Sequence, residues 1–254
     1  MKRIVVKIGS NVLTTDTGKS DVTRMSALVD QIAWLRQQGY QVIVVSSGAG
    51  ACGRTELKVD EHLDSVGQRQ LFCAVGQVKL INYYYTLFRE YHLHVGQVLT
   101  MKENFEHQDQ SDNLKRCMEV MLENDIIPIV NENDTVCLTE LMFTDNDELS
   151  GLVARMMEAE TLVILSNIDG LYNGNPSLPE SQVIRTVRTT DDLSHVIQSS
   201  KSSAGRGGMQ SKYHTATTIA GEGIRVIIAN GKKEHILRDI FLNPQETVFT
   251  EFVR

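Results

Sequence analysis

The chain has 254 residues, which as a prior allows one large α/β domain or two small ones. Its composition, with 41% hydrophobic and 22% charged residues, 18 Gly and only 4 Pro, excludes the disordered, collagen-like and low-complexity classes. The formal net charge of −7 argues against a nucleic-acid partner, because phosphate binding usually needs a basic face. The longest apolar runs fall far short of the ~20 residues of a membrane helix, so we expect no membrane partner either.

Apolar runs alternate with segments of helical periodicity along the chain. The runs predict strands over 3–8, 41–45, 94–99, 126–130, 162–165, 225–229 and 248–252. The periodic segments predict helices over 22–35, 65–91, 112–124 and 149–156, and a further helix from about residue 208. Strands that are apolar throughout and separated by helices predict an α/β fold, with a mainly parallel sheet covered on both faces. We find no internal repeat or linker that would divide the chain, and we interpret 173–179 and 199–205 as surface or active-site loops.

The cysteines are far apart in the sequence and form no C-x-x-C pair; they are Cys52, Cys73, Cys117 and Cys137. This spacing favours structural thiols in a reducing compartment. A basic pair and a short apolar run begin the chain, but the run is far too short for a signal peptide. We therefore expect a cytoplasmic protein. The histidines have no metal-ligand spacing, and the sequence predicts no metal ligands.

Polar residues follow four of the predicted strands, where ligands of parallel sheets bind. These strand ends are Lys7-Ile8-Gly9-Ser10, Ser46-Ser47-Gly48-Ala49, Asn131-Glu132-Asn133-Asp134 and Ser166-Asn167. Ordinary turn chemistry accounts for part of this pattern. Together, however, the four ends predict one polar crevice at one edge of the sheet.

Two glycine-rich segments are candidates for phosphate binding. Residues 48–53 fit G-x-G-x-x-G, but they follow the second strand and lack the expected acidic residue about 20 positions later, which argues against a dinucleotide site. Their glycines would instead let backbone N–H groups approach a ligand beside Ser47. Residues 205–212 lead a glycine cluster into a helix that carries Lys212, which suits a polyphosphate. The alternative is a flexible loop with a solvated lysine.

Charged residues at two further positions have both structural and functional interpretations. Lys7 ends an apolar strand, where its ammonium group could neutralise phosphate charge or could simply be solvated. Asp145 with Glu148 three residues later matches a helix capping box, which is compatible with a binding role. Asn131–Asp134 could likewise form only a turn. No nucleophile elbow or catalytic triad pattern occurs in the sequence.

A set of motifs, in one order over nearly the whole chain, resembles the amino acid kinase superfamily and, within it, the glutamate 5-kinase family. The motifs are Lys7-Ile8-Gly9-Ser10, Ser46-Ser47-Gly48-Ala49, Ala74-Val75-Gly76-Gln77, Asn131-Glu132-Asn133-Asp134, Asp145-Asn146-Asp147 and Gly207-Gly208-Met209-x-x-Lys212. The Asn-Glu-Asn-Asp and Asp-Asn-Asp pair is the most specific part, because it separates this family from kinases of acetylglutamate, aspartate, carbamate or UMP.

The resemblance implies a three-layer αβα sandwich with a mainly parallel central sheet, formed by one amino acid kinase domain over residues 1–254. Residues of about 1–150 would hold the amino acid, and those of about 151–254 would hold ATP. The C-terminal RNA-binding-like (PUA) domain of many bacterial relatives would be absent. The implied reaction is phosphorylation of the γ-carboxylate of L-glutamate by ATP with Mg²⁺, the first step of proline biosynthesis. L-proline would be a feedback inhibitor, and we expect a homo-oligomer of undetermined order.

The resemblance also assigns roles to residues. Lys7 and Lys212 would bridge the ATP phosphates, and Asp147 would orient both lysines. The glutamate site would contain Ser47, Gly48, Ala49, Asn131, Asp134, Asp145 and Asn146. The ATP site would add Gly9, Ser10, Ser166, Asn167, Arg206, Gly207, Gly208, Met209, Gln210 and Ser211 to the two lysines. Asn167 and Arg206 depart from the family pattern, in which many members carry Asp and Thr; the first departure affects hydrogen bonding in the ATP site.

Two other functions are compatible with these residues. One is an amino acid kinase for another small acid or phosphate acceptor, and the other is a non-catalytic amino-acid sensor on the same fold. The presence of both Lys7 and Lys212 argues against the sensor.

Overall fold

The structure is a computed structural model that describes residues 2–58, 63–137, 145–191, 193 and 208–254. Its strands are β1 (Arg3–Ile8), β2 (Gln41–Ser46), β3 (His94–Thr100), β4 (Ile126–Glu132), β5 (Thr161–Ser166), β6 (Thr186–Arg188), β7 (Arg225–Asn230) and β8 (Thr250–Val253). Its helices are α1 (Val22–Gln37), α2 (Ala49–Glu56), α3 (Ser65–Arg89), α4 (Glu103–Glu106), α5 (Gln108–Glu123), α6 (Asn146–Met156), α8 (Met209–Gly221) and α9 (Ile236–Leu242), with a 3₁₀ turn at Ser10–Val12.

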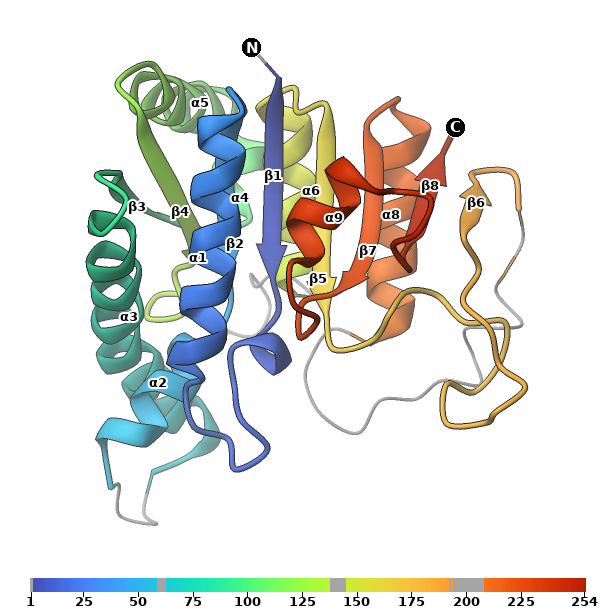
Figure 1. Ribbon diagram of the computed structural model, residues 1–254. Helices are drawn as coiled ribbons and strands as arrows, with labels where there is room; N and C mark the ends of the chain where they lie inside the picture. The colour runs from blue at the N-terminus through green and yellow to red at the C-terminus, as the bar shows by residue number, and fades with distance from the viewer. Residues whose placement is uncertain (1, 59–62, 138–144, 192, 194–207) are drawn as a thin grey trace.

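The strands form one sheet in the order β3-β4-β2-β1-β5-β7-β8-β6 (Figure 1). Neighbouring strands are parallel, except that β8 runs antiparallel to β7. In the register, Ile8 at the end of β1 lies beside Ser46 of β2 and Leu165 of β5. The carboxyl ends of these strands therefore meet at one edge of the sheet, as the sequence predicts.

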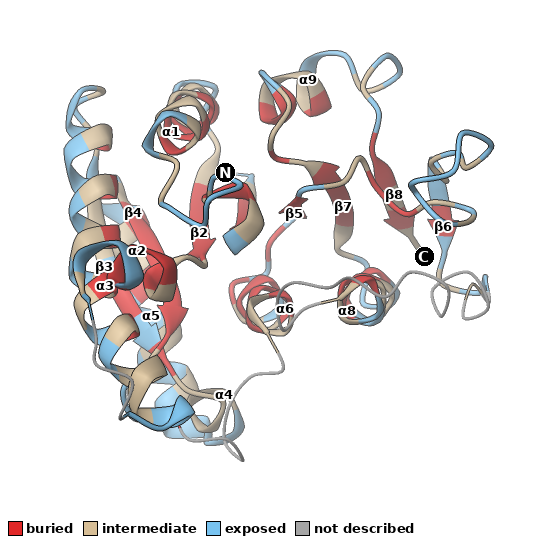
Figure 2. Ribbon diagram, turned by 90° about the horizontal axis from the view of Figure 1, so that it is seen from below, coloured by how far each residue is buried: buried red, intermediate tan, exposed pale blue. Residues whose placement is uncertain are grey.

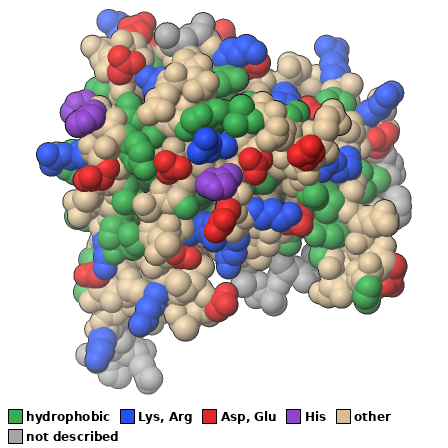
Figure 3. Space-filling model, in the orientation of Figure 1, with side chains coloured by type: hydrophobic (Ala, Val, Ile, Leu, Met, Phe, Trp, Pro, Cys, Tyr) green, Lys and Arg blue, Asp and Glu red, His purple; other side chains and the backbone are tan. Residues whose placement is uncertain are grey.

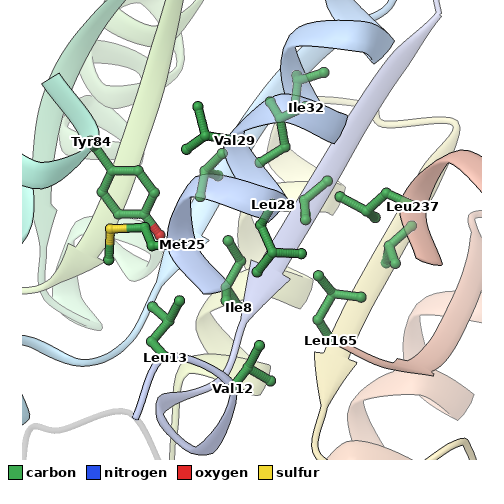
Figure 4. Packing of buried hydrophobic residues seen from close by; sticks show 14 of the residues in the cluster. Ile8, Val12, Leu13, Met25, Leu28, Val29, Ile32, Tyr84, Leu165 and Leu237 are labelled. Carbon is green, nitrogen blue, oxygen red and sulfur yellow. The ribbon is translucent and has the colours of Figure 1, made fainter. Parts of the chain in front are cut away.

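Helices cover both faces of the sheet, so the molecule has three layers. Seen from below, α1 and α9 lie on one side of the strands, and α6 and α8 lie on the other (Figure 2). Alternate residues of β1 supply the two cores: Ile8 packs with α1 and α9, whereas Val5 packs with α6 and α8. Figure 4 shows the first core around Ile8, where Leu28 from α1, Tyr84 from α3 and Leu237 from α9 meet. This arrangement confirms the predicted αβα sandwich.

The predicted strands and long helices are confirmed, with ends that differ by a few residues, but several short elements were not predicted, among them α2, α4, β6 and α9. Glycines that indicated a turn lie inside α2, whereas β6 and α9 have only three and seven residues and too few positions for a clear period. The predicted loop over 173–179 is confirmed and borders the large cavity described below. The predicted loop over 199–205 lies outside the described residues.

The glycines of the G-x-G-x-x-G segment have different structural roles: Gly48 and Gly50 line the large cavity described below, whereas Gly53 does not. Gly48 has a φ of +105°, a conformation that favours glycine, and it precedes α2 as its N-cap. Gly53 lies within α2, and a Cβ there would come 1.9 Å from the carbonyl oxygen of Phe72. Gly76 of α3 is equally constrained, because its Cβ would come 1.8 Å from the carbonyl oxygen of Ala49. Close contact between α2 and α3 therefore explains Gly53 and Gly76.

Basic and acidic side chains are interspersed over the face shown in Figure 3. Elsewhere on the molecule, charged side chains form ion pairs, such as Lys115 with Glu158 and Arg155 with Glu222. Among the described residues, no helix is both long and apolar enough to span a membrane.

Candidate active site

A cavity of about 1080 Å³ opens at the carboxyl ends of the central strands. The first strand end contributes Lys7, the second Ser47, the β4 end Asn131 and the β5 end Ser166. The start of α6, the start of α8 and the loop over 173–177 close the remaining sides. The four strand ends that the sequence predicted to form one crevice therefore line one cavity.

Two lysines and one aspartate form the most buried charged cluster of this cavity. The pleat of β1 directs Lys7 to the same face as Val5, toward α6 and α8. Its Nζ lies 2.6 Å from Oδ1 of Asp147, in the first turn of α6. Lys212 of α8 donates a hydrogen bond of 2.8 Å to Oδ2 of the same carboxylate. The predicted trio is thus brought together, with the aspartate between the two ammonium groups.

The carboxylate of Asp147 is fully buried, with 0% of its surface exposed. Burial by itself would raise its pKa, but the charges and hydrogen bonds of Lys7 and Lys212 outweigh that effect and lower the pKa of Asp147. The group is therefore ionised at neutral pH. Gly9 is closely packed here: a Cβ at this position would make a tight contact of 3.2 Å with the carbonyl oxygen of Leu165 and an ordinary one of 3.5 Å with Nζ of Lys7.

Asp145 caps the first turn of α6. Its Oδ1 accepts hydrogen bonds from the backbone N–H groups of Asp147 at 2.9 Å and Glu148 at 3.1 Å, which confirms the predicted N-cap. Its Oδ2 is buried and has no hydrogen-bond partner among the described residues. Burial and the nearby charge of Asp147 raise the pKa of Asp145, and this rise exceeds the opposite effect of the Ser211 hydroxyl, the Glu148 N–H group and the charge of Lys7. The cavity wall therefore contains a carboxylate oxygen that a cation would stabilise.

Side-chain amides connect the strand ends on the other side of the trio. Nδ2 of Asn146 donates to Oγ of Ser47 at 2.8 Å and to Oδ1 of Asn131 at 3.0 Å. Nδ2 of Asn131 donates in turn to Oε1 of Gln77, on α3, at 2.9 Å. We call these four residues the amide relay. It fixes which atoms of Ser47 and Asn131 face the cavity as donors or acceptors.

The predicted substrate residue Asp134 contacts a basic residue that the sequence did not single out. Nη2 of Arg69, on α3, contacts Oδ1 of Asp134 and lies 3.3 Å from Oε2 of Glu132. The thiol of Cys73 is nearby, and burial followed by the charge of Asp134 raises its pKa to about 12. Burial and the charge of Glu132 likewise raise the pKa of Cys137 to about 11. Both cysteines are therefore protonated at neutral pH, and neither is an activated nucleophile.

The predicted ATP-site residues divide into three groups. Gly9, Ser10, Ser166, Asn167 and Met209 line the cavity, as do Lys7 and Lys212. Gly208 is the N-cap of α8, whereas Gln210 is exposed on that helix; these two and Ser211 do not line the cavity. Arg206 and Gly207 lie outside the described residues. All seven predicted glutamate-site residues line the cavity: Ser47, Gly48, Ala49, Asn131, Asp134, Asp145 and Asn146.

Sequence reasoning did not assign roles to Arg69, Arg54 or Gln77. Arg69 of α3 and Arg54 of α2 line the cavity, and Gln77 accepts a hydrogen bond from Asn131. Gln77 belonged to a motif that carried the family resemblance, which was a usable signal. The two arginines are isolated cations in helical segments, where a solvated residue is the ordinary interpretation.

The sequence is similar to those of known kinases over nearly its whole length. Residues 2–230 match the model of the amino acid kinase family. A glutamate 5-kinase of Bacteroides thetaiotaomicron is 61% identical over 99% of this chain, and one of Chlorobaculum tepidum is 43% identical over 94%. A glutamate 5-kinase of Clostridium acetobutylicum is 37% identical over 94%. The chain spans 70%, 66% and 91%, respectively, of the lengths of these three relatives.

Solved structures support the fold at low sequence identity. A UMP kinase of Bacillus anthracis gives a TM-score of 0.70 at 17% identity, covering 99% of this chain and 96% of that chain. An isopentenyl phosphate kinase in complex with its substrate gives a TM-score of 0.69 at 15% identity, covering 98% and 99%. The arrangement of strands and helices is therefore shared with kinases of several different acceptors.

Proposed function

This chain belongs to the amino acid kinase family, and we propose that it transfers the γ-phosphoryl group of ATP to the γ-carboxylate of L-glutamate. The products are L-glutamyl 5-phosphate and ADP, as in the first step of proline biosynthesis. The observation that carries the proposal is the buried trio of Lys7, Asp147 and Lys212 beside the amide relay, in one cavity.

The acceptor needs no general base. A glutamate side chain has an ordinary pKa of about 4.3, so its carboxylate is already a nucleophile at neutral pH. The barrier lies in bringing this anion onto an anionic phosphate. We propose that Lys7 and Lys212 lower it by placing two ammonium groups on the transferring phosphoryl group. Asp147 holds them in position and accepts no proton.

The family implies Mg²⁺ as the partner of ATP, and Asp145 fits such a cation. Its buried Oδ2 has no hydrogen-bond partner among the described residues. The same residues contain no group of three or more His, Cys, Asp and Glu side chains that could hold a metal, so they form no complete metal cage by themselves. Mg²⁺ typically uses one or two carboxylates together with substrate phosphates. When bound, it would neutralise phosphate charge, and Asp145 would be its protein ligand.

The glutamate site is the other half of the proposal. Ser47 and Asn131, held by Asn146, would bind the acceptor through hydrogen bonds, with the backbone at Gly48 and Ala49 beside them. Asp134 would bind its ammonium group. We further propose that L-proline competes for this site, that the protein is a homo-oligomer, and that it acts in the cytoplasm, in keeping with its four free thiols.

ADP release with a panel of acceptors tests the proposal. We expect turnover with L-glutamate and little with acetylglutamate, L-aspartate or UMP, and hydroxylamine should trap the acyl phosphate as the hydroxamate. Lys212→Ala should lower kcat by about 100-fold or more, because it removes charge stabilisation of the transition state. Asp134→Ala should mainly raise KM for glutamate. Turnover with another acceptor but not with glutamate would refute the assignment, as would near-normal kcat in Lys212→Ala.

A further inference from the structure

We infer that Arg69 binds the α-carboxylate of the amino-acid substrate and thereby determines specificity for it. Asp134, beside Arg69, would bind the α-ammonium group. The inference rests on the proposed function and adds a specificity determinant to it. Arg69 lies on α3, a helix that supplies no other predicted binding residue, and its guanidinium group lines the same cavity as Lys7 and Ser47.

The charges around Arg69 have the pattern that an amino acid requires. Its Nη2 lies between Oδ1 of Asp134 and Oε2 of Glu132, the latter at 3.3 Å. Glu132 is buried, so this contact anchors the guanidinium at the cavity wall. A guanidinium group presents five N–H donors in a planar fork that suits carboxylates, and a carboxylate accepts through two oxygens. Arg69 and Asp134 thus place a cation and an anion side by side, opposite in sign to the two groups on an α-carbon.

The position of this pair in the sheet suits one orientation of glutamate. Asp134 follows β4, which is separated from β1 and its Lys7 by β2 alone. Arg69, Asp134 and the trio of Lys7, Asp147 and Lys212 line the same cavity. An α-carboxylate at Arg69 therefore leaves the γ-carboxylate free to extend toward the phosphoryl group that the two lysines would hold.

Two analogues separate the groups on the α-carbon. Glutarate keeps both carboxylates but lacks the ammonium group, whereas 4-aminobutyrate keeps the ammonium group but lacks the α-carboxylate. The experiment measures KM for L-glutamate and the competitive inhibition constants of both analogues. KM and inhibition constants do not depend on the concentration of folded enzyme. A variant that is partly unfolded therefore still gives the constants of its folded fraction.

For Arg69→Met we expect KM for glutamate and the inhibition constant of glutarate to rise by about 30-fold or more. The inhibition constant of 4-aminobutyrate should stay unchanged within error. Asp134→Asn should give the opposite pattern, weakening 4-aminobutyrate and sparing glutarate. Arg69→Lys should fall between the wild type and Arg69→Met, because lysine keeps the charge but loses the fork.

Two control variants complete the design. Lys79→Met removes a cation of the same helix that pairs with Glu56 and does not line the cavity, and it should change none of the constants. Arg54→Met removes the second arginine of the cavity and should not discriminate between the analogues. Equal weakening of all three ligands in Arg69→Met, or discrimination in Arg54→Met instead, would overturn the inference while leaving glutamate turnover intact. Absence of glutamate turnover in the wild type would instead refute the proposed function.

Discussion

Replacing Asp147 by asparagine tests the central electrostatic argument, because it removes one charge and almost no volume. The two ammonium groups lie 2.6 and 2.8 Å from the two oxygens of one buried carboxylate. In Asp147→Asn they would face each other without a counter-charge. Two unit charges about 6 Å apart repel by about 3 kcal/mol at an effective dielectric constant of about 20. Removal of one partner from a buried ion pair typically costs about 3–5 kcal/mol, which is the same range.

We therefore expect Asp147→Asn to lower the free energy of unfolding by about 3–5 kcal/mol at pH 7, measured by urea denaturation. The expected pH dependence has a definite sign. Because the folded-state pKa of Asp147 is lowered, its contribution is present above the unfolded pKa of about 3.9 and is lost as pH falls through the folded value. The difference between wild type and variant should thus be constant near neutrality and shrink below about pH 4.

Activity gives the second measurement. Lysines that are no longer held by Asp147 stabilise the transferring phosphoryl group less well, so kcat should fall by about 100-fold or more. Asp125→Asn is the matched control, because Asp125 pairs with Arg36 at an exposed position. It should leave stability and kcat unchanged within error. Near-normal kcat in Asp147→Asn, or a stability difference that persists unchanged at pH 3, would refute the reasoning.

Three further predictions follow from the same structure. Asp145→Asn should raise the free energy of unfolding at pH 7 in urea denaturation, because a raised folded-state pKa means that ionised Asp145 opposes folding above about pH 4, and asparagine keeps the cap. The same variant should need more Mg²⁺ for its half-maximal rate; unchanged Mg²⁺ dependence would argue against a ligand role. Gln77→Leu should raise KM for glutamate by about 10-fold without affecting KM for ATP, because Asn131 loses its acceptor. Gly53→Ala should cost about 1–3 kcal/mol in urea denaturation, because α2 must move away from α3; unchanged stability would contradict the packing argument.

The main strands and long helices were predictable because one physical property decides each of them. Residues 42–45 are apolar at every position, as only a strand buried on both faces requires. Such runs differ clearly from the periodic positions of α1. The segment of α2 failed the same test, since Gly50 and Gly53 indicate a turn locally. What requires Gly53 inside this helix is the backbone of α3, about 20 residues later, which no local pattern contains.

The same distinction applies to the site. Lys7 and Lys212 are unusual for their positions, at the end of an apolar strand and after a glycine cluster, so each could be singled out by itself. Arg69 has no such local signal. It is one of three basic residues in a helix of 25 residues. Its acidic partners lie 63 and 65 positions away in the sequence. Its importance follows from tertiary structure alone.

The chain carries a net charge of −7, yet its proposed substrates are both anions, so the sign of the field inside the cavity matters more than the total. At the β1 end, two ammonium groups face one carboxylate, which leaves an excess of positive charge for phosphate and the γ-carboxylate. At the β4 end, one guanidinium group faces two carboxylates, which leaves an excess of negative charge for an ammonium group. Glutamate bound backwards would bring its ammonium group to Lys7 and Lys212. The cavity therefore favours one orientation of the substrate, and that orientation presents the carboxylate to be phosphorylated.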